Sequence, residues 1–284
     1  MKVKEKVASF GTTSNYPLSI NYIIFAKIYL MDSSLLILGV LVFVAGFVDS
    51  IAGGGGLITL PAYLNYGVDE NLLLGTNKLS STIGTAAAVI KYLDEIRFSA
   101  ALVLTLFISA TLFSFLGAYF ISLLPSYLVK MALFFFLPPL SFYIIRRKDF
   151  GVKDTSEMIT ESEKLTKIFI ISSLISFYDG MMGPGTGTFL AIGYSKFVGY
   201  DILKSTVLAK LTNLISNISA LITFLYLERV NLWLGASMGL VSVIGNYFGA
   251  NMTLKKGVWI IKPMIAIISN IILLKLILET FKSL

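Results

Sequence analysis

The sequence of 284 residues contains no cysteine and no histidine. These absences exclude disulfides, a thiolate nucleophile, a histidine proton relay and ordinary haem or zinc sites. Any group that handles protons must therefore be Asp, Glu, Lys or Tyr, and we expect no cofactor.

Charge is also scarce. Only 14% of the residues are charged, against 56% hydrophobic residues and a mean hydropathy of +0.83. This leaves too little polar surface for a water-soluble globule, so the sequence predicts an integral membrane protein with a single membrane domain. The net charge of +7 would suggest a nucleic-acid partner in a soluble protein. Here most cations lie in short loops, as the topology rule predicts, so we expect a bilayer as partner and no nucleic acid.

Apolar segments long enough to cross a bilayer recur along the chain and predict an all-α membrane protein with about eight transmembrane helices. The predicted spans are Ser34 to Ala52, Leu72 to Leu93, Ala100 to Leu124, Tyr127 to Ile145, Thr166 to Met182, Ile202 to Leu227, Leu232 to Leu254 and Val258 to Phe281.

A long polar connection, residues 146–166, divides the chain into a first transmembrane repeat at 35–145 and a second at 167–284. Residues 1–34 are predicted to be a disordered or interfacial extension, because Lys27 interrupts their apolar run and no signal-peptide cleavage site follows. A later start at Met31 is an alternative.

The two halves share polar landmarks. Asp49 and Asp179 are 130 positions apart (179 − 49), and Lys78 and Lys210 are 132 apart (210 − 78). The Gly117-Ala118-Tyr119-Phe120 and Gly245-Asn246-Tyr247-Phe248 blocks are offset by 128 (245 − 117). A duplicated plan whose halves meet at a central site is typical of transporters.

Each half contains a glycine-rich break within apolar sequence. Such backbone is tolerated in a bilayer only where protein buries it or where it lines a wet cavity, so the paired breaks indicate a transport site. The predicted break residues are Gly53, Gly54, Gly55 and Gly56 in the first half and Gly183, Pro184, Gly185 and Gly187 in the second.

The segments after the breaks, Leu57 to Tyr66 and Thr188 to Val198, are too short to span and are predicted to be re-entrant or half-helices. If they complete no crossing, the repeats are parallel; if they do, the repeats are inverted. Because the N-terminus and the polar connection are rich in basic residues, we expect both to lie in the cytoplasm, with Arg97 and Arg229 on the same side. Lys255 and Lys256 fit this orientation poorly.

After each break a helix carries a lysine among polar residues. Lys78, Ser81, Thr85 and Ala88 share one helical face, and Lys210, Asn213, Asn217 and Ala220 share the matching face. A lysine near a helix end often reaches the headgroups instead. Its repetition in both halves beside hydroxyl and amide groups favours an inward-facing site.

Lysines, hydroxyls, amides and the free N–H groups of half-helix starts are all donors, so the implied ligand is a small oxyanion or carboxylate. The predicted substrate-binding residues are Lys78, Lys210, Asn77, Ser81, Thr59, Asn213, Asn217, Thr186 and Thr188.

Asp49 and Asp179 allow two interpretations. Each aspartate caps a helix end or pairs with the lysine of its own half, which neutralises a buried charge. Alternatively, desolvation lets an aspartate take up a proton and couples anion movement to the proton gradient. Gly235 with Gly239, and Gly245 with Gly249, are predicted to allow close helix packing.

Two other functional classes compete with a transporter. An intramembrane aspartyl protease would use Asp49 and Asp179 as a catalytic dyad, although buried lysines nearby oppose a shared proton. A structural membrane subunit would leave the matched polar residues unexplained. A nucleotide-binding loop at Gly53 to Gly56 is excluded, because no Gly-Lys-Ser/Thr follows.

These motifs together resemble the TauE/SafE family of sulfite and organosulfonate exporters, over Leu35 to the C-terminus. The resemblance rests on Gly46 to Ser50, Gly53 to Pro61, Leu74 to Lys78, Phe177 to Gly180, Gly183 to Thr188 and Ala209 to Asn213. It implies a multipass permease of the plasma membrane for a small sulfur-containing or carboxylated anion. Substrates vary within the family, and the sequence leaves open the substrate, the direction of transport and whether the protein is a homo-oligomer.

Overall fold

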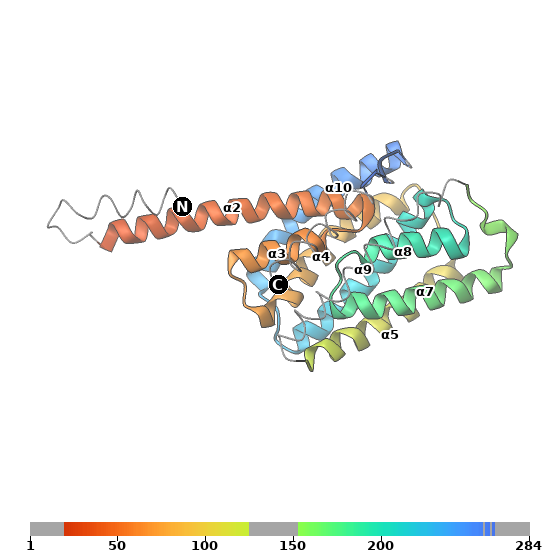
Figure 1. Ribbon diagram of the computed structural model, residues 1–284, viewed down its shortest axis with the longest axis horizontal. Helices are drawn as coiled ribbons and strands as arrows, with labels where there is room; N and C mark the ends of the chain where they lie inside the picture. The colour runs from red at the N-terminus through yellow and green to blue at the C-terminus, as the bar shows by residue number, and fades with distance from the viewer. Residues whose placement is uncertain (1–19, 125–152, 258, 262, 265–284) are drawn as a thin grey trace, which may run out of the picture. The chain divides into compact units, whose positions relative to one another are not determined.

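The computed structural model describes residues 20–124, 153–257, 259–261 and 263–264, with side chains from residue 33 onward (Figure 1). Every regular element in these ranges is a helix, as predicted. The chain divides into an N-terminal unit that ends at Ile37 and a second unit that begins at Leu38. The helix contacts and the site described below lie in the second unit.

The helices follow the predicted spans where the structure describes them, except that α2 begins at Ile20 and not at Ser34, and α7 begins at Glu161 and not at Thr166. The predicted span Tyr127 to Ile145 lies outside the described residues, as does almost all of Val258 to Phe281. The elements are α2 (Ile20–Ala52), α3 (Gly56–Tyr66), α4 (Glu70–Leu93), α5 (Ala100–Ser122), η1 (Ser156–Met158), α7 (Glu161–Met181), α8 (Thr186–Gly193), the π-helical turn η2 (Tyr194–Val198), α9 (Ile202–Tyr226) and α10 (Leu232–Lys256).

Four stretches are long and apolar enough to cross a membrane by length and composition: Ser33–Ala52, Ala100–Ser122, Ile202–Tyr226 and Leu232–Lys256. Together with the overall composition they identify a membrane protein. The helices α4 and α7 are also long, at 24 and 21 residues, but carry more polar and charged residues.

Helix caps repeat between the halves and extend the duplication seen in the sequence. Asp69 caps α4 by accepting from the Asn71 N–H, and Asp201 caps α9 by accepting from the Lys204 N–H, an offset of 132 (201 − 69). In the same way Ser99 caps α5 and Asn231 caps α10. Equivalent N-caps at one offset show that both halves fold into the same helix hairpin.

The contacts between helices set the direction of each half. On α5 and α7, Ser109 meets Ser172 and Ser114 meets Gly180, so the two helices run parallel. They lie side by side in Figure 1. On α4 and α10, Leu79 meets Gly235 and a residue further along, Ile83, meets Gly239, so these helices are also parallel.

The first segment of each half therefore packs on the last described helix of the other half. The part of α2 from Leu38 runs parallel to α10, because Phe43 meets Gly245 and Phe47 meets Gly249. Since α4 and α5 form a hairpin, α2 and α7 point in opposite directions and the two repeats are inverted. This settles the alternative that the sequence left open in favour of inverted repeats.

Inversion corrects one prediction. Because α4 and α9 are antiparallel, Arg97 after α4 and Arg229 after α9 lie at opposite ends of the helix bundle. The prediction that they share a side was wrong, since it counted eight crossings without the short segments. The close helix packing predicted at Gly235, Gly239, Gly245 and Gly249 is confirmed: a Cβ atom at Gly249 would lie 2.0 Å from Ser50 Oγ.

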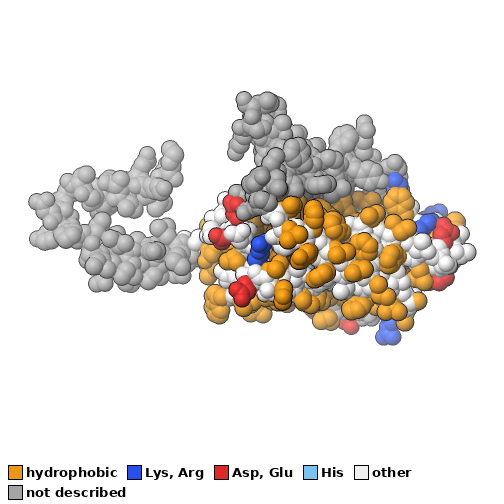
Figure 2. Space-filling view, turned by 90° about the horizontal axis from the view of Figure 1, so that it is seen from below, with side chains coloured by type: hydrophobic (Ala, Val, Ile, Leu, Met, Phe, Trp, Pro, Cys, Tyr) orange, Lys and Arg blue, Asp and Glu red, His pale blue; other side chains and the backbone are white. Residues whose placement is uncertain are grey.

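Two apolar clusters fill the two ends of the bundle. At the end where α4 begins and α10 begins, here the Glu70 end, Tyr63, Phe224 and Met238 belong to one cluster. At the end where α4 and α10 finish, here the Lys256 end, Leu106 and Ile168 belong to another. Figure 2 shows a face covered mainly by hydrophobic side chains, as lipid contact requires, with charged residues toward its two ends.

The described part of the polar connection is fastened to the end of η2. The Thr155 N–H donates to the Gly199 carbonyl at 2.7 Å, and Lys204 pairs with Asp154 at 3.3 Å. Partial desolvation raises the pKa of Asp154, but hydrogen bonds from Ser156 and the Lys204 ammonium outweigh it, so this pKa lies below its usual value.

Candidate functional site

The two backbone breaks touch each other. Gly53 follows α2 with a φ of +77°, and a Cβ atom added there would lie 2.3 Å from Gly187 Cα. In the second break Gly183 and Gly185 also have positive φ, at +90° and +79°. Glycine is needed in this region both for the left-handed backbone and for the close approach of one break to the other.

Both predicted lysines are buried. Lys78 is 3% exposed and Lys210 is 1% exposed, so neither reaches the headgroups. Lys78 Nζ lies 2.9 Å from Asp179 Oδ1, and Lys210 Nζ lies 2.6 Å from Asp49 Oδ2. The interpretation that each aspartate pairs with the lysine of its own half was wrong. Each ion pair joins the two halves, because inversion places each break beside the lysine helix of the other repeat.

The two ion pairs lie at different depths. Lys78 Nζ donates to Asn217 Oδ1 at 2.8 Å, and Asn217 is seven residues (217 − 210) beyond Lys210 on α9. Seven helical residues correspond to about 10 Å. Because α4 and α9 are antiparallel, Lys78 lies closer to the Glu70 end and Lys210 closer to the Lys256 end.

A cavity lies between the two halves, with a volume of ≈ 20 Å³, enough for about one water molecule. In this conformation the cavity is therefore too small for an anion of several atoms. Of the predicted site and break residues, those that line the cavity are Asp49, Gly53, Gly56, Asn77, Lys78, Ser81, Asp179, Gly183, Asn213 and Asn217.

The other predicted residues do not line the cavity but contact the lining residues or the two breaks. Lys210 holds Asp49, and Thr186 Oγ1 donates to Asp179 Oδ1 at 2.9 Å. Thr59 Oγ1 donates to Asn77 Oδ1 at 2.5 Å, while the Thr188 hydroxyl donates to the Ala52 carbonyl at the end of α2. Gly187 contacts Gly53, and the Gly55 N–H donates to Asp49. The Pro184 carbonyl accepts a hydrogen bond from the Tyr178 hydroxyl, and Gly185 is the N-cap of α8. Gly54 lies in the turn between α2 and α3.

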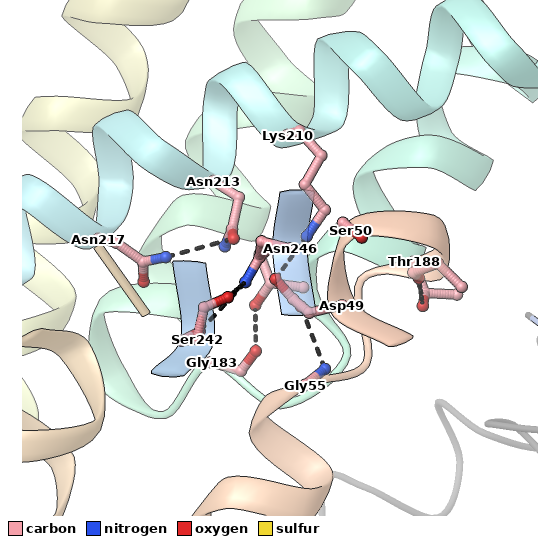
Figure 3. A network of polar contacts seen from close by, with 12 residues as sticks. Asp49, Ser50, Gly55, Gly183, Thr188, Lys210, Asn213, Asn217, Ser242 and Asn246 are labelled. Carbon is pink, nitrogen blue, oxygen red and sulfur yellow. Dashed lines mark hydrogen bonds and ion pairs between the residues drawn. The ribbon is translucent and has the colours of Figure 1, made fainter. Parts of the chain in front are cut away.

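Figure 3 shows the network around Asp49, Lys210 and Asn213. The site also includes polar residues to which the sequence gave no role. Ser216 donates to Asp179, and Asn246 on α10 donates through Nδ2 to the Ser242 carbonyl at 3.0 Å. Asn246 belongs to the block at Gly245 to Phe248 that matches the block at Gly117 to Phe120, but this match predicted no role for it.

A tyrosine-to-hydroxyl contact also repeats between the halves. Tyr63 donates to Ser80 Oγ at 2.8 Å, and the Tyr194 and Thr212 hydroxyls are 2.9 Å apart. Ser80 and Thr212 keep the lysine offset of 132 (212 − 80), so the same comparison of halves that found the lysines would have found them. Each contact ties a short helix to the helix that carries the lysine.

The arrangement suits neither a metal nor a protease. Within the residues that the structure describes, no group of three or more Asp and Glu side chains gathers to hold a metal ion. An aspartyl dyad needs two carboxylates that share a proton. Here Asp49 and Asp179 are each bonded to a different lysine, which gives the protease alternative no support.

Comparison with known proteins identifies the family of this chain. The model of a family described as "Sulfite exporter TauE/SafE" matches residues 38–276. The chain belongs to the TauE/SafE family. It is 34% identical over 240 residues to the "Probable membrane transporter protein ORF9" of Sinorhizobium sp, covering 84% of this chain and 90% of that protein. No solved structure matches it closely enough to show a relationship.

Two further TauE/SafE relatives have similar names. The chain is 31% identical over 237 residues to a "Probable membrane transporter protein" of Haemophilus influenzae, covering 84% of this chain and 92% of the relative. It is 33% identical over 263 residues to the "Probable membrane transporter protein YfcA" of Escherichia coli K12, covering 86% of this chain and 91% of YfcA. These relatives are named as transporters and none as an enzyme.

Proposed function

We propose that this TauE/SafE protein is a secondary transporter of the plasma membrane that moves a small anion by alternating access. The observation that carries the proposal is the pair of lysines, 3% and 1% exposed, held at the junction of two inverted repeats. A charged side chain is costly at membrane depth and usually marks a substrate or ion pathway. Inverted repeats that meet at broken helices supply the two alternative packings that alternating access requires.

The substrate class follows from the donors. Lys78, Asn77, Ser81, Asn213 and Asn217 line the cavity together with the broken backbone, and ammonium, amide and hydroxyl groups bind oxyanions and carboxylates. The family description names sulfite. We therefore propose a small sulfur-containing anion such as sulfite or a sulfonate, or else a short carboxylate.

The small cavity fits one stage of such a cycle. At ≈ 20 Å³ it holds about one water molecule, so an anion of several atoms enters only when the halves separate. Each ion pair links the halves, one nearer each end of the bundle, so opening toward either side must loosen the pair on that side. We propose that the aspartates in these pairs couple the movement to protons.

Flux into proteoliposomes of labelled sulfite, thiosulfate, sulfate, methanesulfonate and acetate tests the proposal. Substituting one member of a buried ion pair leaves the other charge unpaired, at a cost of about 3–5 kcal/mol, and risks unfolding. We therefore choose pairwise neutral variants, Lys78→Met with Asp179→Leu and Lys210→Met with Asp49→Leu, because replacing both partners is often nearly neutral.

Each double variant should still fold. Its anion flux should fall by roughly tenfold or more, which corresponds to about 1.4 kcal/mol of lost stabilisation of the transported anion. Arg97→Ala, which removes an exposed cation at the Lys256 end, is the matched control and should transport normally. Normal flux through both folded double variants would contradict the proposal, as would the absence of flux of every anion through the wild-type protein.

A further inference from the structure

The two homologous aspartates have unequal surroundings. The Asp179 carboxylate is 1% exposed and receives hydrogen bonds from Thr186, Asn213 and Ser216 in addition to its ion pair with Lys78. The Asp49 carboxylate is 17% exposed, lines the cavity and has two donors, Lys210 Nζ and the Gly55 N–H at 3.1 Å. The Asp179 carboxylate is therefore held by more hydrogen bonds than the Asp49 carboxylate, which is also more exposed.

The sequence gives the reason for this difference. Two of the three side chains that donate these hydrogen bonds to Asp179 have counterparts without a donor side chain in the first half: Gly84 stands where Ser216 does (216 − 132), and Gly56 where Thr186 does (186 − 130). A side chain at Gly84 has no room, because its Cβ atom would lie 2.1 Å from Ser242 Oγ. The counterpart of Asn213 is Ser81 (213 − 132), which lines the cavity.

The groups that hold Asp49 would equally hold a substrate anion. Lys210 supplies an ammonium group, and Gly55 supplies an N–H at the start of α3, an 11-residue helix whose positive end favours anions. The cavity lies beside this carboxylate. The Asp49 carboxylate thus binds the same donors that an incoming anion would need.

Charge limits how the exchange can occur. Lys78 and Lys210 balance Asp49 and Asp179, so the site is neutral as it stands. The charged and titratable groups that face Asp49 are Lys210 on α9, Lys78 and Tyr92 on α4, and Asp179 on α7. An added anion would leave one uncompensated negative charge in a buried site, which is costly. One proton on Asp49 restores neutrality.

We propose, on the basis of the transport function above, that Asp49 is the proton carrier and that one proton crosses with each monovalent anion, while Asp179 stays ionised on Lys78. A proton from the aqueous side adds to the Asp49 carboxylate, which releases Lys210 and the Gly55 N–H to the anion. On the other side the anion leaves, Asp49 gives up its proton and the Asp49–Lys210 pair forms again. Each cycle is electrically neutral.

The stoichiometry is tested with the labelled anion that the wild-type protein carries, beginning with methanesulfonate because it has one charge at every working pH. For one proton per anion, one unit of pH difference should drive about tenfold accumulation on the alkaline side. A clamped membrane potential should change this accumulation little. Accumulation that follows the potential, or that ignores pH, overturns the inference while leaving transport intact.

Variants assign the carrier. Asp49→Asn should abolish accumulation driven by pH while exchange of labelled for unlabelled anion remains detectable, and Asp49→Glu should restore pH-driven accumulation. Asp179→Asn should reduce both activities together, because it leaves Lys78 without its carboxylate. Tenfold accumulation per pH unit by Asp49→Asn overturns the assignment. If the wild-type protein carries no anion in the panel, the proposed function fails and this inference fails with it.

Discussion

At the scale of single residues, the site depends on groups that are too close to tolerate additions. Gly53 and Gly187 bring the two breaks into backbone contact, and Ser216 and Asn213 saturate Asp179. The same positions in the other half carry Gly84 and Ser81. Small differences between matched positions therefore give two homologous carboxylates different freedom, although both arise from one duplicated pattern.

Gly53→Ala should destabilise the protein and stop transport. The substitution forces a left-handed backbone onto a residue with a Cβ atom, at about 1–2 kcal/mol, and places that atom 2.3 Å from Gly187 Cα. We expect a lower melting temperature in detergent and loss of anion flux. Gly39→Ala on α2, where an added Cβ meets no atom within 4 Å, is the matched control and should be neutral or slightly stabilising. Equal behaviour of the two variants would contradict the break contact.

At the scale of helices, each half is built around elements of the other. The helix α7 packs on α5, and α2 from Leu38 packs on α10, with glycines at the crossings. In each of these interfaces, the helix that ends at a break, α2 or α7, packs on the helix that follows a lysine-bearing helix, α10 after α9 or α5 after α4. Neither half can then position its own aspartate without the other half, which explains why both ion pairs cross between the repeats.

A disulfide tests the parallel packing of α5 on α7. The Ser109 and Ser172 hydroxyls lie 2.5 Å apart, and the chain has no native cysteine, so Ser109→Cys with Ser172→Cys should crosslink under mild oxidation. Cleavage between the halves, at a protease site inserted in the polar connection, followed by non-reducing electrophoresis would detect the link. Ser109→Cys with Ser176→Cys, one turn further along α7, should crosslink poorly. The reverse preference would be inconsistent with this register.

At the scale of the whole molecule, the basic residues gather at one end of the bundle. Among the described residues of the second unit, the lysines and arginines outside the site fall at the Lys256 end except for Arg229, which lies at the Glu70 end and donates to the Ser122 carbonyl. Those at the Lys256 end are Lys91, Arg97, Lys153, Lys164, Lys167, Lys196, Lys204, Lys255 and Lys256. The positive-inside rule therefore predicts that the Lys256 end faces the cytoplasm.

Labelling of single cysteines tests this orientation, again without native cysteine as background. In intact cells a membrane-impermeant maleimide should label Asn65→Cys, an exposed position at the end of α3, and should leave Lys256→Cys unlabelled until the cells are opened. The opposite labelling pattern would reverse the orientation.

Much of the fold was predictable from sequence, where the signal is local. The span Ile202 to Leu227 agrees with α9 to within one residue, because apolar sequence and the Asp201 cap mark it. The start of α7 was placed late, at Thr166, because its first turn carries Glu161 and Glu163 behind the Thr160 cap, and hydropathy does not report charged helix starts. The expected number of eight spans extends beyond the described residues.

By itself the sequence determined that this is a helical membrane protein of two duplicated halves with breaks, lysines and aspartates in register, because composition and offset are properties of the chain. Tertiary structure alone decided that the repeats are inverted, that Lys78 pairs with Asp179 and Lys210 with Asp49, and that the two pairs lie at different depths. These features depend on which helix packs against which and in what direction. Residues more than a hundred positions apart meet only through that packing, and the periodicity of one segment carries no information about it.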